Sequence, residues 1–326
     1  MMKNKVPLAA LMLLSPAALA NAQTLQPDAI DGASITPTLL ERTTETSDKP
    51  DPAIVRLQVL LDRAGASPGV IDGFAGENVA KAIAAFETMQ GLSADGTLDA
   101  EVIGRLPEQT TVVEPYVISE DDAQGLVSEI PEDYSEQAKM AQLGYTSVAE
   151  KLAERFHMDI DLLKALNQTS AFSVGDTVSV VNPGPSTQGT VKRIEAHRRT
   201  GQIVALGADD TLIAAYPATI GSRETPSPSG THKVKGVARM PPYVYNPKIN
   251  FKQGDNRKIL TLPGGPNGPV GTVWIDLSKP TYGIHGTPEP SMIDKSGSHG
   301  CVRLTNWDAE ELAGMVKPGV IVEFVD

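Results

Sequence analysis

The sequence predicts a multidomain chain with a small three-helix domain, then a small α/β module, then a mostly-β C-terminal domain. Three observations lead to this fold class. A length of 326 residues is enough for about two or three domains. Apolar residues recur at helical spacing in the first half of the chain and alternate with polar residues in the second half. Stretches rich in proline, glycine or carboxylates separate these patterns and predict the segment boundaries.

Residues 1–22 have the composition of a secretory signal peptide. Lys3 and Lys5 supply a positive start, and residues 6–20 form an apolar run that is too short to span a bilayer. We therefore expect an exported, periplasmic protein that is not membrane-spanning. Residues 23–50 are rich in Thr, Pro, Asp and Glu without clear periodicity, so they are expected to form a linker.

A compact helical domain is predicted for residues 51–107. Asp99 is a candidate cap for its third helix. The apolar faces of the first two helices are predicted to comprise Ile54, Leu57, Leu60 and Leu61, and Val79, Ala82, Ile83 and Phe86. The dipeptides Asp72-Gly73 and Asp95-Gly96 are expected to form the turns between helices.

Residues 108–140 are predicted to form an acidic linker. Nine carboxylates and no basic residue lie between Arg105 and Lys139. Because like charges repel, this segment is expected to be extended and solvated.

Residues 141–183 are predicted to form a module of two helices and a strand. Ser147 and Asp159 are candidate N-caps for the helices, and residues 177–181 have the composition of a strand. The helical stripes are Val148, Leu152 and Phe156, and Ile160, Leu163 and Leu166.

Residues 189–326 form the predicted mostly-β domain. Its one clear helix covers residues 306–316, with Asn306 as the candidate cap. The candidate strands are residues 191–197, 202–206, 211–217, 232–237, 273–277 and 320–325.

The composition excludes several classes of function. A net charge of −12 disfavours binding to nucleic acid or to anionic lipid, both of which require a basic surface. The single cysteine makes neither an internal disulfide nor a cysteine-rich zinc module. No His-Glu-x-x-His motif supports a zinc hydrolase, so neither a metal nor another cofactor is expected.

The single cysteine lies in a segment with the residues needed for acyl transfer, Ser298-His299-Gly300-Cys301-Val302-Arg303-Leu304. A nucleophilic thiol needs a base and donors for the developing oxyanion. Either His285 or His299 could be the base, and the backbone N–H groups of Gly300 and Cys301 are the candidate oxyanion donors. Arg303 could hold a substrate carboxylate or brace the loop. The alternative is a buried core cysteine, and the flanking residues argue against it.

These residues, with His285-Gly286-Thr287 upstream, resemble the signature of the L,D-transpeptidase (YkuD) family. The context Leu262-Pro263-Gly264-Gly265-Pro266-Asn267 is similar to the periplasmic ErfK/YbiS-like branch. The resemblance implies that Cys301 is the nucleophile and that His285 is the base. His299 and Ser298 would then tune the site, with Ser298 bonding to an imidazole. The substrate-binding candidates are Ser298, Gly286, Thr287 and Arg303.

The two N-terminal units also resemble known modules. Residues 57–96 look like the three-helix peptidoglycan-binding domain of bacterial wall enzymes. Leu166-Asn167 and Val174-Gly175-Asp176-Thr177-Val178 are similar to the end of a LysM module. The usual Gly-Asp-Thr-Leu opening of LysM is replaced by Gly144-Tyr145-Thr146-Ser147, a departure in the loop that holds sugar in that family.

The resemblance implies an enzyme that acts on tetrapeptide stems of peptidoglycan through a cysteine thioester. The expected partners are stem peptides and glycan. If the acceptor amine belongs to a stem, a 3-3 cross-link forms. If it belongs to an outer-membrane protein or lipoprotein, that protein is attached to the wall. With water as acceptor, the enzyme would be a carboxypeptidase or would release bound protein. The remaining alternative is a non-catalytic wall-binding protein.

Overall fold

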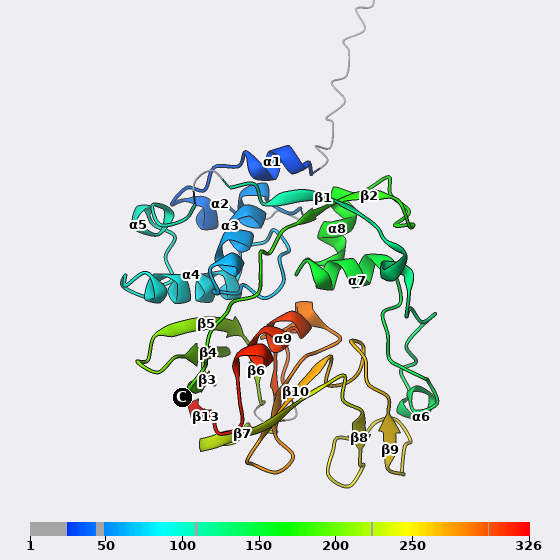
Figure 1. Ribbon diagram of the computed structural model, residues 1–326. Helices are drawn as coiled ribbons and strands as arrows, with labels where there is room; N and C mark the ends of the chain where they lie inside the picture. Colours follow the sequence, from blue (N-terminus) through cyan, green and yellow to red (C-terminus); the bar gives the residue numbers. More distant parts are fainter. Residues whose placement is uncertain (1–24, 44–48, 108–109, 223, 299) are drawn as a thin grey trace, which may run out of the picture.

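The computed structural model describes residues 25–43, 49–107, 110–222, 224–298 and 300–326. The helical N-terminal half lies on one side of the molecule and a large sheet lies on the other, with helix α9 (Asn306–Met315) at the junction between them (Figure 1). This arrangement places the C-terminal helix in contact with both halves.

The N-terminal domain is formed by short helices around a buried helix, α3. Asp51 caps α3 by accepting from the amide of Ala53, and Asp99 caps α5 as the sequence predicts. Proline at the first helical position of α3 already has the backbone angle that a helix requires. The helices are α1 (Pro27–Asp31), α2 (Leu39–Thr43), α3 (Pro52–Arg63), α4 (Glu77–Met89) and α5 (Ala100–Ile103).

The structure differs from the predicted linker at residues 23–50. Helices α1 and α2 lie in this segment, and Ile30 and Leu39 are fully buried in the same core as α3. Single apolar anchors of this kind give no periodicity, so the sequence pattern did not reveal them. Residues 1–22, the predicted signal peptide, lie outside the described residues.

The structure also differs from the predicted solvated linker at residues 108–140. Strand β1 (Val113–Val117) pairs with β2 (Thr177–Val181), and the segment also contains η1 (Glu120–Ala123) and α6 (Tyr134–Gln137). Asp122 is fully buried and forms an ion pair with Arg155 at 2.7 Å. A basic residue from the next module thus compensates a charge that the sequence pattern treats as unpaired.

The module that follows contains α7 (Val148–Arg155) and α8 (Ile160–Leu166), capped by Ser147 and Asp159 as predicted. Its turn is bonded to the N-terminal domain, because the amide of Ile71 donates to the carbonyl of His157 and the amide of Asp159 donates to that of Ile71, both at 2.8 Å. The apolar side chains of the two units form one cluster. The module and the helical domain therefore pack as a single unit.

The C-terminal domain is built on a nine-stranded sheet, counted over the described residues, in the order β5-β4-β3-β13-β7-β10-β11-β12-β6. Its strands alternate buried and more exposed residues, as a half-covered sheet requires. The strands are β3 (Arg193–His197), β4 (Gln202–Leu206), β5 (Leu212–Pro217), β6 (Thr219–Ile220), β7 (Gly230–Arg239), β10 (Val273–Leu277), β11 (Gly283–His285), β12 (Val302–Arg303) and β13 (Ile321–Val325). A short helix, η2 (Pro290–Met292), lies between β11 and β12.

Helix α9 packs on this sheet, and its cap differs from the prediction. Thr305, not Asn306, is the N-cap, and its side chain accepts from the amide of Asp308 at 3.1 Å. Asn306 is the first helical residue, and its side-chain amide bonds instead to Glu154 of α7.

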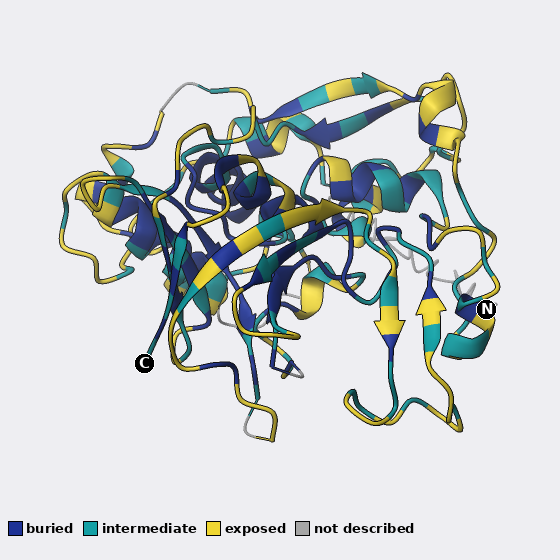
Figure 2. Cartoon of the chain, turned by 60° about the horizontal axis from the view of Figure 1, so that its bottom comes forward, coloured by how far each residue is buried: buried dark blue, intermediate teal, exposed yellow. Residues whose placement is uncertain are grey.

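A separate hairpin of β8 (Tyr243–Tyr245) and β9 (Leu260–Leu262) projects from the C-terminal domain, and the middle residue of each strand is exposed (Figure 2). Its buried face forms a small cluster with Leu143 and with side chains from residues 130–140, including Tyr134 of α6. The end of the predicted acidic linker is therefore anchored on this hairpin.

The two halves of the molecule are docked through backbone and side-chain bonds. The loop after α3 pairs with the edge strand β5, where Ser67 donates to Ala215 and Ala215 donates to Gly65, both at 2.9 Å. Lys81 on α4 forms an ion pair with Asp294 beside η2. A covered sheet edge is also protected from pairing with other chains.

Candidate active site

The residues singled out from the sequence meet on two adjacent strands. Strands β11 and β12 run parallel, with Ile284 opposite Val302 and His285 opposite Arg303. Cys301 directly precedes β12, so the pairing brings the thiol next to the strand that carries His285. The parallel register thus brings together two residues that lie sixteen positions apart in the sequence.

The thiol of Cys301 is held by the backbone of the turn before β11. Its Sγ donates to the carbonyl of Thr281 at 3.7 Å, and the backbone of Gly283 also hydrogen-bonds to it. Gly300 has a φ of +106°, a conformation that favours glycine, and a Cβ there would lie 2.9 Å from the ring of Tyr282. The ring of Tyr282 therefore packs against the nucleophile loop.

Ser298 braces this loop from inside, and its predicted bond to an imidazole stays a prediction. Its Oγ donates to the carbonyl of Cys301 at 2.6 Å and accepts from the amides of Gly221 and Gly300 at 2.8 and 3.3 Å. Ser298 is only 4% exposed. The Gly300 amide, one of the two predicted oxyanion donors, is therefore engaged with Ser298.

His285 is buried and its tautomer is fixed by its neighbour. Nδ1 lies 2.6 Å from the carbonyl oxygen of Gly286, which can only accept, so Nδ1 carries the proton. Nε2 is then the unprotonated nitrogen. The ring stacks on Trp274 of β10, with centroids 5.5 Å apart and planes inclined by 19°. This geometry holds the imidazole in one orientation with its basic nitrogen available.

Burial keeps both reacting groups neutral. It lowers the pKa of His285 to about 4, against the raising effect of the bond to Gly286, and the nearby Arg303 lowers it further. Burial also raises the pKa of the Cys301 thiol, although the Gly283 backbone bond and Arg303 act in the opposite direction. Both shifts favour the neutral thiol and the neutral imidazole over an ion pair.

The remaining candidates surround this pair. Arg303 donates through Nη2 to Ser296 Oγ at 3.3 Å and to the carbonyl of Gly297, which is the bracing contact of the two alternatives weighed from the sequence. Thr287 is 2% exposed and bonds to the amide of Glu289 within the turn after His285. His299, the rival base, lies outside the described residues.

Sequence reasoning missed two residues that support the base. Trp274 lies opposite His285 in the antiparallel pairing of β10 and β11, and a hairpin register would have been needed to find it. Asn306 contacts the turn that follows His285: a Cβ added at Gly286 would lie 2.1 Å from Asn306 Oδ1. Its position next to a helix start led to a capping prediction instead.

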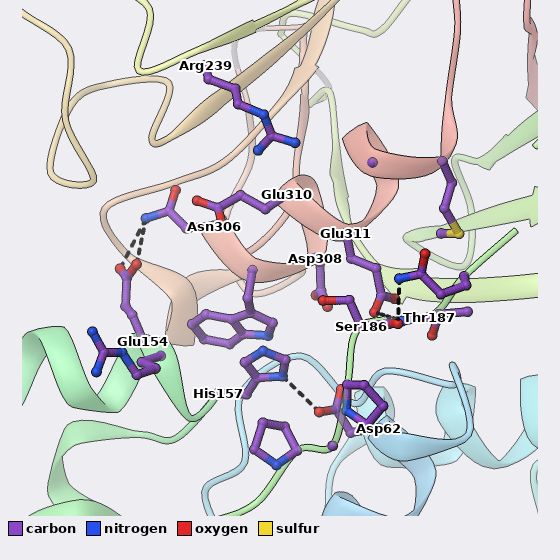
Figure 3. Close-up of a pocket in the computed structure, with 18 of the residues that line it drawn as sticks. Asp62, Glu154, His157, Ser186, Thr187, Arg239, Asn306, Asp308, Glu310 and Glu311 are labelled. Carbon is purple, nitrogen blue, oxygen red and sulfur yellow. Dashed lines mark hydrogen bonds and ion pairs between the residues drawn. The ribbon is translucent and has the colours of Figure 1, made fainter. Parts of the chain in front are cut away.

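A cavity of about 610 Å³ lies at the junction of α3, α7 and α9, and it is lined by neither Cys301 nor His285. His157 stacks on Trp307 there, with centroids 5.2 Å apart, and its Nδ1 donates to the Asp62 carboxylate at 2.8 Å. Figure 3 shows Glu154 and Asn306 facing each other across one end of this cavity. Most of the side chains that line the cavity are polar or charged, and helix α9 contributes several of them.

A cysteine and a buried, oriented histidine on paired strands of a mostly-β domain are the groups that a cysteine acyltransferase needs. The comparisons identify which kind. Residues 191–323 match the family model of the L,D-transpeptidase catalytic domain (YkuD), and residues 50–106 match that of a "Putative peptidoglycan binding domain". Both resemblances and the predicted fold class of these two domains are thereby confirmed.

Curated relatives agree with these matches. A Bacillus licheniformis protein named "Putative L,D-transpeptidase YkuD" is 32% identical over 161 residues, which cover 49% of this chain and 82% of that protein. Its Bacillus subtilis namesake is 31% identical over 144 residues, covering 44% and 73%. The "Probable L,D-transpeptidase YbiS" of Escherichia coli K12 is 30% identical over 118 residues, covering 35% and 38%. The chain belongs to the L,D-transpeptidase (YkuD) family.

Among solved structures, L,D-transpeptidase 3 from Mycobacterium tuberculosis matches with a TM-score of 0.34 and 17% identity, over 47% of this chain and 76% of that one. A similarity this weak carries no conclusion. The two matched domains are those of a cell-wall-associated L,D-transpeptidase. Within the described part of the chain, no helix combines the length and the apolar character needed to cross a membrane.

Proposed function

We propose that this L,D-transpeptidase transfers an acyl group from a peptidoglycan tetrapeptide stem to an amine through a thioester on Cys301. The observation that supports the proposal is the parallel pairing of β11, which carries His285, with β12, which Cys301 directly precedes; the Nδ1 of His285 is bonded to the carbonyl of Gly286. One nitrogen of His285 is thereby fixed as a donor, and the other is left as a base.

The first half-reaction forms the thioester. Cys301 Sγ bonds to the carbonyl carbon of the donor peptide while the thiol proton passes to His285 Nε2. The bond from that carbon to the nitrogen of the terminal D-alanine then breaks, and Nε2 returns the proton to the leaving amine. The amide of Cys301 donates to the oxyanion that forms between these steps. The products are a Cys301 thioester and free D-alanine.

The second half-reaction passes the acyl group to the acceptor. The acceptor amine attacks the thioester carbonyl and gives a proton to His285 Nε2, and the carbon–sulfur bond breaks as the proton returns to sulfur. Because the pKa of the imidazole is lowered to about 4, His285 stays neutral and ready to accept a proton throughout the neutral range. An amine on a second stem gives a 3-3 cross-link, and an amine on an envelope protein attaches that protein to the wall.

The surrounding residues shape the site without reacting. Arg303, opposite His285 in the pairing of β11 with β12, braces residues 296–297, and its charge is available to a substrate carboxylate if that loop opens. Gly286 and Thr287 form the turn that holds the base, and Ser298 holds the nucleophile loop. The peptidoglycan-binding domain would bring the enzyme to its polymer, in the periplasm. Sugar binding by the LysM-like module stays a prediction.

The full chain, incubated with tetrapeptide muropeptides with and without an amine acceptor, tests this function by mass spectrometry of the products. Loss of D-alanine together with cross-linked dimers supports the transferase. Loss of D-alanine without an acceptor adduct would point to a hydrolase instead. Unchanged muropeptides would leave only a wall-binding role. Activity that persists in Cys301→Ala would show that Cys301 is not the nucleophile.

A further inference from the structure

We propose that Glu154, on helix α7 of the central module, is a positioning residue for the base His285 and that it acts through the side chain of Asn306. The inference rests on the proposed role of His285 as the base. It makes the module part of the catalytic apparatus in addition to any role in wall binding.

The first contact joins the module to helix α9. Asn306 Nδ2 donates to both carboxylate oxygens of Glu154, at 3.1 and 2.9 Å, and the hydroxyl of Tyr145 donates to Oε2 at 3.1 Å (Figure 3). Glu154 is 8% exposed and Asn306 is 2% exposed. A buried carboxylate costs several kcal/mol to desolvate unless donors compensate it, so these bonds fix the position of both side chains.

The second contact joins Asn306 to the turns around the base. Its Oδ1 accepts from the amide of Thr272 at 3.1 Å, and its Nδ2 donates to the carbonyl of Pro266 at 3.2 Å. The backbones of Gly271 and Gly286 approach so closely that an added Cβ would lie 2.0 and 2.1 Å from Oδ1. The amide thus serves as a spacer on which both glycine turns are packed.

The third contact reaches the imidazole. The carbonyl of Gly286 accepts the Nδ1 proton of His285 at 2.6 Å, and the amide of Gly286 donates to Val273 at 3.3 Å. A rotation of the Asn306 amide would therefore shift the Gly286 peptide and turn the ring with it. Positional errors of about 1 Å in a catalytic group can lower a rate about 100-fold, so the orientation of a remote amide is kinetically significant.

The carboxyl group of Glu154 gives this series of contacts a pH dependence. Burial raises the pKa of Glu154 to about 7, against the lowering effect of the bonds from Asn306 and Tyr145, while the nearby carboxylates of Glu150 and Glu310 raise it further. Lys151 and Arg155 on α7, Arg239 on β7 and Glu310 on α9 line the same cavity. The ionised carboxylate offers two acceptor oxygens to its donors, and protonation removes one of them.

A purely structural role would predict something different. If Glu154 only held the module against α9, its loss would lower the free energy of unfolding without altering the chemistry of molecules that remain folded. If it positions the base, folded molecules should lose kcat while KM is kept, because Glu154 lines a cavity that neither Cys301 nor His285 lines. The two roles are therefore separable.

The test compares Glu154→Ala, Glu154→Gln, Glu310→Gln and His285→Ala in the full chain. Each is assayed from pH 5 to 9 for the rate of Cys301 alkylation by iodoacetamide and for kcat and KM of D-alanine release, with folding checked by circular dichroism. We expect Glu154→Ala to lower kcat and the alkylation rate by about tenfold or more with KM unchanged. Glu154→Gln, which keeps one acceptor, should match the wild type below pH 6 and fall roughly threefold to tenfold behind it above pH 8.

Glu310→Gln is the matched control, because it removes a carboxylate from the same cavity and leaves the bonds between Glu154 and Asn306 in place. It should keep the wild-type rates and slightly lower the pH at which Glu154 titrates, because the charge of Glu310 raises the pKa of Glu154. Equal rates for Glu154→Ala and the wild type, or a constant ratio between Glu154→Gln and the wild type at every pH, would overturn the positioning role. If His285→Ala alkylates at the wild-type rate as well, the proposed base itself is wrong, which is a separate failure.

Discussion

The catalytic strands and the junction of α3, α7 and α9 differ in which titratable groups they bury. Around Cys301 and His285, backbone carbonyls and an aromatic ring surround the reacting groups, and burial favours their neutral forms. At the junction of α3, α7 and α9, burial instead encloses carboxylates, and it raises the pKa of Glu154 to about 7 and that of Asp308 to about 8. The site is therefore insensitive to pH near neutrality, whereas its support titrates there.

This contrast shows how the two regions depend on pH in opposite directions. His285 binds its proton less readily when folded than when unfolded, so it removes stability as the pH falls from about 6.5 towards 4. Glu154 binds its proton more readily when folded, so its contribution to stability is complete below pH 4.5 and is lost as the pH rises through about 7. Because the ionised Glu154 is the form that positions His285, activity should rise across neutral pH while stability falls.

The largest effect should come from the base. Replacing His285 with Gln keeps a polar group of similar size but removes proton transfer, and we expect kcat for D-alanine release to fall by about 10² to 10⁴-fold. The measurement is a full kinetic comparison with the wild type from pH 5 to 8. A variant that kept its kcat would show that the proton goes elsewhere, with His299 as the next residue to replace.

Next comes the stability of the junction. Between pH 5 and pH 8 the wild type should lose stability on the order of 3 kcal/mol from Glu154 alone, as a shift of this size implies. Urea unfolding of Glu154→Gln at both pH values should show a flatter dependence, while Glu310→Gln should follow the wild type. Parallel curves for all three proteins would contradict the buried, titrating carboxylate.

A smaller effect is expected at the ring that supports His285. A Cβ at Gly283 would lie 2.5 Å from the indole of Trp274, so Gly283→Ala must displace the ring and should destabilise the fold by about 1–3 kcal/mol. Because that ring stacks on His285, kcat should fall as well. Thermal unfolding with a parallel kinetic assay checks both. Unchanged stability and kcat would show that Trp274 does not support His285.

Gly314→Ala should produce the smallest change, and of opposite sign. Gly314 lies in α9 at the junction with nothing within 4 Å of an added Cβ. Alanine is the better helix former, so we expect a gain of about 0.5–1 kcal/mol in thermal unfolding with unchanged activity. A loss of stability here would mean that α9 is packed more tightly against the module than its open cavity face indicates.

The sequence predicts those parts of the site whose residues lie close together along the chain. The lone Cys301 and the nearby His285 could be found because one short segment and one turn carry them, and strand β4 was predicted at its observed bounds. The caps at Ser147 and Asp159 are also local, which is why they were predicted.

The rest depends on pairings that no local pattern encodes. Glu154 and Asn306 are 152 positions apart, and the partners of Ser298 include Gly221, 77 positions away. Asn306 was interpreted as a cap because it stands where caps stand, yet Thr305 takes that place and frees the Asn306 amide for the module. Likewise Asp122 could be buried only because Arg155 pairs with it, which charge counting along the chain does not show.

The most direct test of the catalytic claim is the intact mass of the full chain, measured shortly after mixing with a tetrapeptide donor and no amine. We predict an added mass equal to the donor minus D-alanine, located on the peptide that contains Cys301, and its disappearance when an amine is supplied. Release of D-alanine without any such adduct, or the same adduct on Cys301→Ala, would contradict the account.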